Sequence, residues 1–253
     1  MTRYGQIASG LLYSGSPSLM KGRIVFGATL FAAGLLFTAC QSSKYAGYTS
    51  IWGDYRCAVP RGWQVITERD KGDFTNTNFV GPFEPGFLLG VPSMSVRWHA
   101  YNAAHRLPDG QLELYSNVDD YIQQTLRDVY QPNLKLVNNS GKVDEKTLND
   151  RPARYFVASS PERVPSSLKW GTVIDADSGL PYNIRQHAYW VLPGERGFYV
   201  LIYPATKEGY PLYEKQFNQL ASSFAILKDG PDGPESSSAA RKPGGIPVRR
   251  KLP

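Results

Sequence analysis

Apolar and polar residues alternate in short runs over much of this chain, a pattern typical of half-buried β-strands. The clearest alternation spans residues 93–101. Its two faces carry Val96, Trp98 and Ala100 on one side and Arg97, His99 and Tyr101 on the other. Further strands are predicted at 54–59, 63–67, 134–137, 142–148, 153–159, 171–175, 182–192 and 198–203. Turn residues separate most neighbours, so the pattern predicts hairpins.

Two segments have helical periodicity instead. The first begins after Asn117, a suitable N-cap, and ends before Pro132. Its apolar stripe consists of Val118, Tyr121, Ile122, Leu126 and Val129. The second spans about residues 211–224, with Pro211 near its first turn. Strands joined mainly by hairpins, with two helices inserted, predict an α+β fold with a central antiparallel β-sheet flanked by helices.

The N-terminal region has the features of a bacterial signal peptide. Lys21 and Arg23 precede an apolar run of 14 residues, 24–37, which leads through two small residues to Cys40. The segment resembles a lipobox, although Phe37 stands where that motif usually has Leu, Val or Ile. We therefore expect lipidation of Cys40 and a membrane-anchored protein. An uncleaved anchor helix is the alternative, but the run is shorter than the ~20 residues that span a bilayer.

The same pattern divides the chain into five parts. We expect an upstream extension at 1–19 if Met20 is the true start, a signal peptide at 20–39, a tether at 40–50, one domain at 51–228 and a disordered tail at 229–253. By resemblance to bacterial sorting rules, Gln41 favours the outer membrane, with the domain facing the periplasm. If Cys40 is acylated, Cys57 has no partner for an internal disulfide.

Charge excludes one class of partner. The net charge is +6, but much of the excess lies in the signal region and in the tail. The predicted domain is close to neutral, so we expect no nucleic-acid partner.

Four segments together resemble the PsbP-like family, in the order in which that family has them. They are Val59-Pro60-Arg61-Gly62-Trp63, Val118-Asp119-Asp120-Tyr121, Arg151-Pro152-Ala153-Arg154-Tyr155 and the stretch 217–224. The resemblance covers roughly residues 54–227, and one departure is Asp150, where the family often has Gly. It implies an α-β-α sandwich, a frequent accessory or scaffold role, and no shared set of catalytic residues.

Motifs for catalysis or for a cofactor are not found in the sequence. There is no G-x-S-x-G, H-E-x-x-H, C-x-x-C or phosphate-loop pattern. The three histidines, His99, His105 and His187, are scattered, and the acidic run at 175–179 reads as a turn rather than a calcium loop. The sequence thus predicts a protein without catalytic activity, metal or cofactor. A hydrolase would require a serine or aspartate beside a histidine in a cleft.

Two groups of residues are candidates for binding. The first lies in the segment 72–92, predicted as an irregular loop, and consists of Phe79, Phe83 and Phe87. The second is an aromatic and histidine face formed by Trp98, His99, His187 and Trp190, beside Arg97 or Arg185. The favoured hypothesis is a non-catalytic envelope lipoprotein that binds another envelope protein. The alternative is a lipoprotein that binds a small ligand or glycan on the aromatic and histidine face.

Overall fold

The computed structural model describes residues 44–231, apart from 71–72, 86, 88–89, 107–109, 111, 165–172, 175–178 and 180. The predicted signal peptide, Cys40 and the tail from residue 232 onward lie outside the described residues. Within the described part, no helix is both long enough and apolar enough to cross a membrane.

The core of the fold is a nine-stranded sheet in which all the pairings are antiparallel. Its main path runs β3 (Gln64–Asp70), β4 (Phe74–Val80), β5 (Ser93–Ala100), β13 (Gly197–Tyr203), β12 (Pro181–Pro193), β10 (Arg151–Arg163) and β8 (Lys135–Leu136). Beside this path, β9 (Asp144–Leu148) pairs with β10, and β11 (Val173–Ile174) pairs with β12.

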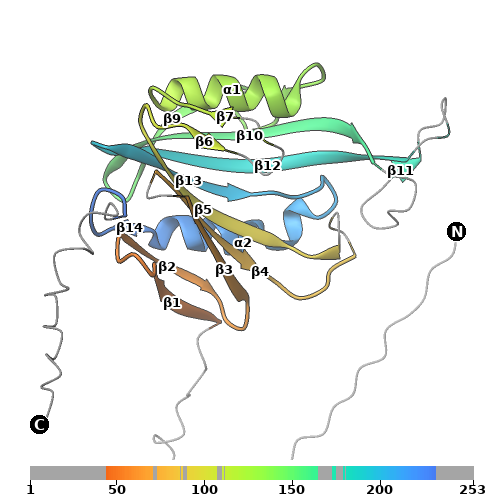
Figure 1. Ribbon diagram of the computed structural model, residues 1–253. Helices are drawn as coiled ribbons and strands as arrows, with labels where there is room; N and C mark the ends of the chain where they lie inside the picture. The colour runs from red at the N-terminus through yellow and green to blue at the C-terminus, as the bar shows by residue number, and fades with distance from the viewer. Residues whose placement is uncertain are drawn as a thin grey trace, which may run out of the picture. The chain divides into compact units, whose positions relative to one another are not determined.

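One helix packs on each face of this sheet (Figure 1). Helix α1 (Val118–Tyr130) covers one face and α2 (Tyr210–Ser223) the other. Strand β13 contributes to both cores, because Phe198, Val200 and Ile202 pack on the α1 side and Tyr199, Leu201 and Tyr203 on the α2 side. All six are buried, which explains why this strand is apolar along its whole length. The prediction of an α+β fold with a central antiparallel sheet flanked by helices is confirmed.

Helix α1 begins where the sequence predicted. The side chain of Asn117 accepts a hydrogen bond from the backbone N–H of Asp120 at 2.8 Å, which satisfies one of the free donors of the first turn. Asp119 and Asp120 in that turn also interact favourably with the helix dipole. The helix ends at Tyr130, just before the Gln131–Pro132 bond.

A smaller sheet corrects the predicted tether at 40–50. It consists of β1 (Tyr45–Thr49), β2 (Tyr55–Pro60) and β14 (Ala225–Ile226). The domain therefore begins at Tyr45 or earlier, rather than at residue 51. The ring of Tyr48 packs against Phe79 at 5.1 Å and Tyr55 at 6.2 Å, and these aromatic contacts hold the strand on the domain. A third sheet pairs β6 (His105–Arg106) with β7 (Leu112–Glu113).

The segment 72–92 is also more regular than predicted. Residues 74–80 form β4, which pairs with β3 on one side and β5 on the other. Phe79 and Phe87 are buried in the α2-side core, whereas Phe83 is 59% exposed. Thr75, Asn76 and Thr77 gave this strand a polar sequence, yet all three are buried because β4 is not an edge strand.

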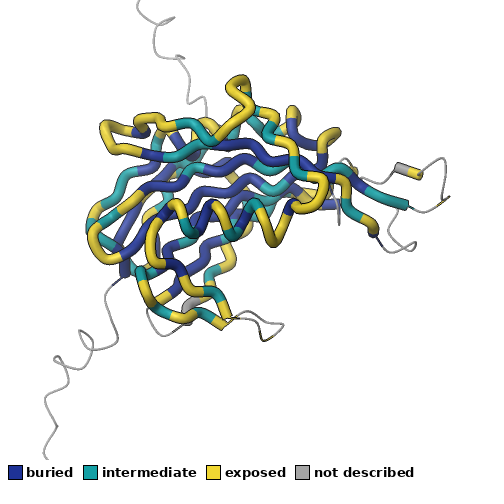
Figure 2. The backbone as a smooth tube through the Cα atoms, turned by 90° about the horizontal axis from the view of Figure 1, so that it is seen from above, coloured by how far each residue is buried: buried dark blue, intermediate teal, exposed yellow. Residues whose placement is uncertain are grey.

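The domain continues past its predicted end at residue 228. The backbone N–H of Arg196 donates to Asp229 Oδ2 at 2.6 Å, and that of Gly230 donates to the Tyr199 hydroxyl at 3.1 Å. Gly230 has a φ of +76° and lies so close to the Trp98 ring that a Cβ would clash with it. Residues 229–231 therefore belong to the fold. Figure 2 shows the buried positions concentrated in the strands, with exposed positions in the turns between them.

Candidate functional site

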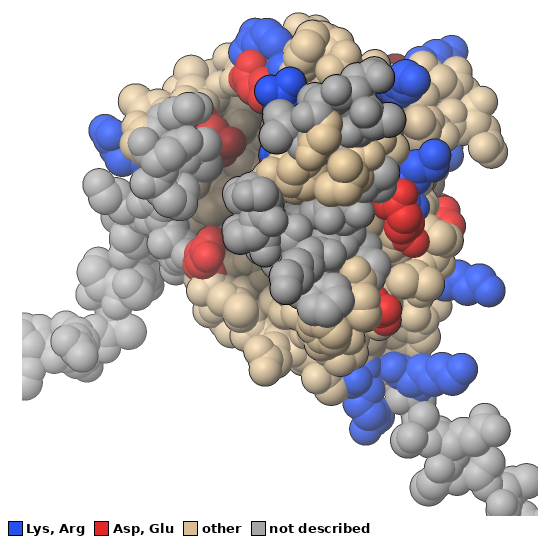
Figure 3. All heavy atoms as spheres, turned by 90° about the vertical axis from the view of Figure 1, so that its right-hand side faces the viewer, with Lys and Arg blue, Asp and Glu red and all other residues tan. Residues whose placement is uncertain are grey.

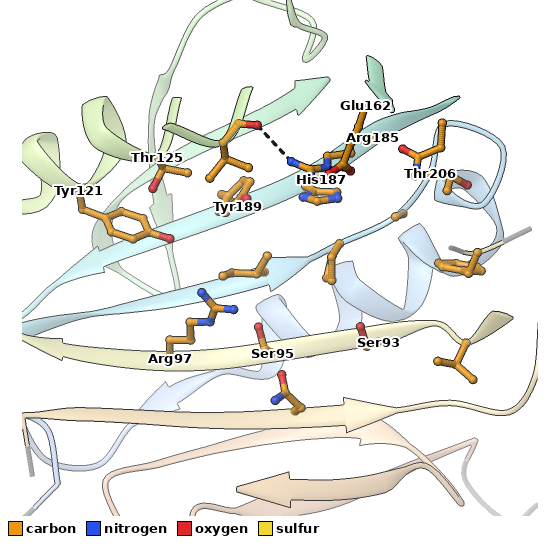
Figure 4. Close-up of a pocket in the computed structure, with 18 of the residues that line it drawn as sticks. Ser93, Ser95, Arg97, Tyr121, Thr125, Glu162, Arg185, His187, Tyr189 and Thr206 are labelled. Carbon is orange, nitrogen blue, oxygen red and sulfur yellow. Dashed lines mark hydrogen bonds and ion pairs between the residues drawn. The ribbon is translucent and has the colours of Figure 1, made fainter. Parts of the chain in front are cut away.

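A hollow lined by described residues lies between α1 and the sheet face below it (Figure 4). Its volume is about 630 Å³, within the range of small-molecule sites. Side chains from α1, β4, β5, β10, β12, β13 and the segment after β13 line it. We call this hollow the α1 groove.

The β4–β5 side of the α1 groove is polar because of the strand period. On β5, Ser93, Ser95 and Arg97 point to the same face, since side chains two apart along a strand share a face. Ser95 lies directly opposite Asn78 on β4 in the antiparallel register. Tyr121 of α1 lines the groove above this row (Figure 4).

On the β12 side of the groove, Arg185 is bonded to other residues of the protein. Its guanidinium forms a two-point ion pair with the Glu162 carboxylate on β10. A third bond runs from Arg185 Nη1 to the backbone carbonyl of Val129 on α1, at 3.1 Å. Two strands and a helix are thus tied together, and most of the hydrogen-bonding capacity of this guanidinium is used.

His187 lies in a hydrogen-bonded chain of neutral side chains. Its Nδ1 is 2.8 Å from the hydroxyl of Tyr130, which is 2.6 Å from the hydroxyl of Tyr189. Burial, followed by the nearby positive charges of Arg185 and Arg97, lowers the pKa of His187 to about 3. The imidazole is therefore neutral at neutral pH and offers hydrogen bonds rather than charge.

Two other polar groups of the α1 groove lack partners. The Nε atom of Arg97 is buried without a hydrogen-bond partner, and none of the ion pairs between described residues involves Arg97. The side chain of Asn183 is fully buried, with neither its oxygen nor its nitrogen bonded. Unbonded buried polar groups are costly, so these two are the groups of the groove with hydrogen-bonding capacity left to offer a ligand.

The structure separates the predicted aromatic and histidine face. His187 lines the α1 groove, but Trp98 and Trp190 belong to the core on the other side of the sheet. Trp190 packs there on Tyr155, with ring centroids 4.6 Å apart. Alternation along β12 and β5 explains the split, since neighbouring strand residues face opposite ways.

His99 is buried in an aromatic cluster rather than exposed. Its ring stacks on Phe198 at 5.2 Å and lies 5.3 Å from Tyr115 and 4.9 Å from Phe74. Burial, together with the charges of Arg97 and His105, keeps the pKa of His99 well below its usual value. Within the described residues, no group of three metal-ligating side chains is found.

Of the predicted phenylalanines, one remains on the surface. Phe83 lines a second, shallower hollow with Trp63, Pro82 and Val91. Phe87 touches the α1 groove only from its buried position in the core, and Phe79 is fully buried. Phe83 is therefore the residue of this group that a partner could reach.

Sequence reasoning missed Ser95, Asn78, Glu162 and Asn183. The strict alternation of β5 was a usable signal for Ser95, since it places this residue on the same face as Arg97. For the others there was no signal, because their part in the groove depends on which strands become neighbours.

Comparison with known proteins gives similarity to solved structures only. No family model and no curated protein matches this chain. One similar structure is the cyanobacterial PsbP (CyanoP) of Synechocystis sp. PCC 6803, at 12% identity, with 76% of this chain and 99% of that chain covered and a TM-score of 0.42.

Two more structures show similarity at the same level. A protein of Bacteroides thetaiotaomicron VPI-5482 has 13% identity, 74% of this chain and 50% of that chain covered, and a TM-score of 0.40. The Ran-binding protein Mog1p of Saccharomyces cerevisiae has 10% identity, 73% and 96% covered, and a TM-score of 0.39. Similarity of this degree does not transfer function, which must be argued from the residues of this chain.

Proposed function

We propose that this chain is a non-catalytic, ligand-binding lipoprotein of the bacterial cell envelope, with the α1 groove as its binding site. The supporting observation is the pair of unbonded polar groups, on Arg97 and Asn183, in a hollow large enough for a small molecule. A ligand that bonds to either group would supply hydrogen bonds that no described residue makes there.

The groove is suited to binding rather than to proton transfer. A general base at neutral pH needs a pKa near 7, whereas the pKa of His187 is lowered to about 3 and its Nδ1 is engaged by Tyr130. The neutral hydroxyl and amide groups around it are those that fix the orientation of a bound molecule.

The sequence of the N-terminal region supports an envelope location. The cationic residues, apolar run and cysteine at 20–40 support lipidation of Cys40, which would hold the domain on a membrane surface. Gln41 supports the outer membrane, with the domain in the periplasm.

Filling the groove tests the binding function. Ser93, partly exposed on β5, lines the groove, so Ser93→Trp should occupy the space of a ligand. The control is Thr147→Trp, at an exposed strand position outside the groove. We expect native mass spectrometry of protein purified from its own membranes to show a bound small molecule on the wild type and on Thr147→Trp but not on Ser93→Trp. Retention by Ser93→Trp, or no bound mass on any of the three, would contradict the proposal.

Binding of an envelope protein is the second candidate, favoured by one observation. Phe83 is 59% exposed and Val91 beside it 37% exposed, in the shallow hollow at the end of β4. Such apolar exposure is typical of a contact surface. Phe83→Ser should abolish co-purification of a crosslinked envelope protein, whereas Leu112→Ser, also highly exposed but on β7, should not. An unchanged set of crosslinked proteins would exclude Phe83 from the contact.

A further inference from the structure

We propose that the ligand of the α1 groove carries a carboxylate or phosphate group and that Arg97 binds this anion. This inference rests on the ligand-binding function proposed above and specifies the chemical class of the ligand.

The two arginines of the groove, Arg97 and Arg185, differ in whether their charge and their hydrogen-bond donors are already paired within the protein. Arg185 is neutralised by Glu162 and also bonds to the carbonyl of Val129. Arg97 forms no ion pair with a described residue, and its buried Nε has no acceptor. A guanidinium presents five N–H donors in a planar fork that matches a carboxylate or a phosphate. Arg97 is therefore the cation with unused capacity.

The immediate neighbours of Arg97 on the sheet are neutral hydrogen-bonding groups. Asn76 lies directly opposite it on β4, and Ser95 precedes it by two residues on the same face. Ser95 in turn lies opposite Asn78, which lines the groove. Ser95 and Asn78 form a cross-strand pair with Cβ atoms about 5 Å apart and lie next to Arg97 on the same face, so they offer hydrogen-bonding groups beside it in the groove.

The acids near the groove do not neutralise Arg97. Glu162 is paired with Arg185, and Glu68 accepts a bond from Asn76 Nδ2 at 3.2 Å. Glu113 lies beside Tyr115, where its charge contributes to raising the pKa of that phenol. The positive charge of Arg97 is felt at His187, whose pKa it helps to lower. At His187 and Tyr189 the positive charges of Arg97 and Arg185 act together, so this part of the groove favours a negative group. Beside Tyr115 and Tyr121, the charge of Glu113 opposes that of Arg97.

The far end of the groove suggests the shape of the ligand. Arg97 and Val191 are both register partners of Val200, and Asn183 is eight residues from Val191 along β12. At the usual strand rise, this places Asn183 on the order of 25 Å from the level of Arg97. Because the Asn183 amide is neutral, an extended ligand would place an uncharged polar group there and its anion at Arg97.

Titration with small anions tests whether Arg97 binds a carboxylate or phosphate group. The full chain in detergent is titrated with sodium phosphate and, separately, with sodium acetate at constant ionic strength, and the amide resonances of the groove strands are followed by NMR. We expect saturable shifts in the wild type. Arg97→Gln should weaken the binding by about tenfold or more, because it removes a charge-assisted pair of hydrogen bonds. The anion affinity of Arg97→Lys should lie between those of the wild type and Arg97→Gln, because lysine keeps the charge but lacks the planar fork.

A matched control separates this site from general charge effects. Arg127 is on α1, 67% exposed at its side chain and paired with Asp128, so Arg127→Gln removes the same charge outside the groove. The affinity of Arg127→Gln for phosphate and acetate should equal that of the wild type. Saturation by phosphate alone, by acetate alone or by both supports the proposal and identifies the anionic group. Saturation by neither, or equal affinity in Arg97→Gln and the wild type, overturns it.

The outcome is distinguishable from failure of the binding function itself. If Ser93→Trp removes the native ligand while Arg97→Gln retains it at unchanged affinity, the groove binds a ligand but the anion assignment is wrong. If neither variant affects the native ligand, both proposals are wrong. Should Arg97→Gln not fold, Arg97→Lys gives the same comparison with a smaller loss of affinity.

Discussion

Tyr199 shows how one hydroxyl can join three parts of the chain. It donates to Asp54 Oδ2 at 2.8 Å, just before β2 of the small sheet, and accepts from the Gly230 N–H at 3.1 Å near the end of the domain. Asp54 is fully buried, so its carboxylate depends on this partner. The position of Tyr199 on the central strand β13 makes the bond possible.

Removal of this hydroxyl should destabilise the fold. We expect Tyr199→Phe to lower the free energy of unfolding by about 1–3 kcal/mol, the usual cost of leaving a buried polar group unbonded. Urea unfolding followed by tryptophan fluorescence measures this value. An unchanged unfolding free energy would show that water or another group replaces the bond.

A second residue-scale prediction concerns acid. The pKa of His187 in the folded protein, about 3, lies below its ordinary value of 6.5. Between these pH values the unfolded chain binds a proton that the folded chain does not, so stability falls as pH decreases from about 6.5 toward 3. The slope from one such group is at most about 1.4 kcal/mol per pH unit.

His187→Gln isolates this contribution, because buried His99 and the carboxylates still titrate in the variant. Urea unfolding over a pH series should show that the variant loses less stability than the wild type below pH 6.5 and runs parallel to it above that value. Parallel curves throughout would contradict the neutral assignment of His187.

At the scale of elements, α1 forms one wall of the α1 groove. Its N-cap bond from Asp120 N–H to Asn117 is exposed and independent of the core. Asn117→Ala should therefore cost about 1 kcal/mol of unfolding free energy. Asn117→Asp should restore most of it, because a carboxylate can accept the same bond. Equal loss in both variants would assign the effect to something other than capping.

The elements that the sequence predicted well are those with a strong period of their own. Both helices, the central strand β13 and the alternating strand β5 agree with the structure, because each signals its buried face in its own residues. Strands β1 and β4 were missed for a physical reason. The buried Thr75, Asn76 and Thr77 read as a loop, and β1 is held by Tyr48 contacts with residues elsewhere in the chain. Tertiary context overrides local propensity in both strands.

At the scale of the whole molecule, the site was less predictable than the fold. His187 and the neighbouring arginines could be named from sequence, and the alternation along β5 and β12 was a usable signal for their separation from Trp98 and Trp190. Glu162 neutralises Arg185 only because β10 and β12 are neighbours. The pairing of β10 with β12 therefore explains why Arg185 has an acidic partner among the described residues and Arg97 does not, and no sequence motif indicates this difference.

The proposed anchor gives a prediction at this scale too. Cys40→Ala should move the protein from the membrane fraction to the soluble fraction, since the acyl chains would have no attachment site. Immunoblotting of fractionated cells checks this, with Cys57→Ala as the matched control, because the Cys57 thiol is buried. If Cys40→Ala stays in the membrane fraction, an uncleaved apolar helix or another contact holds the protein there.

The early start of β1 limits how far the domain could stand from a lipid. Tyr45 is five positions after Cys40, and a fully extended chain of that length spans at most about 17 Å. If Cys40 carries the proposed acyl chains, the domain stays close to the membrane surface and cannot reach across the periplasm. Its ligand would have to reach the bilayer surface itself, or be produced there, which makes neighbouring proteins and lipids of the same membrane the first place to look for it.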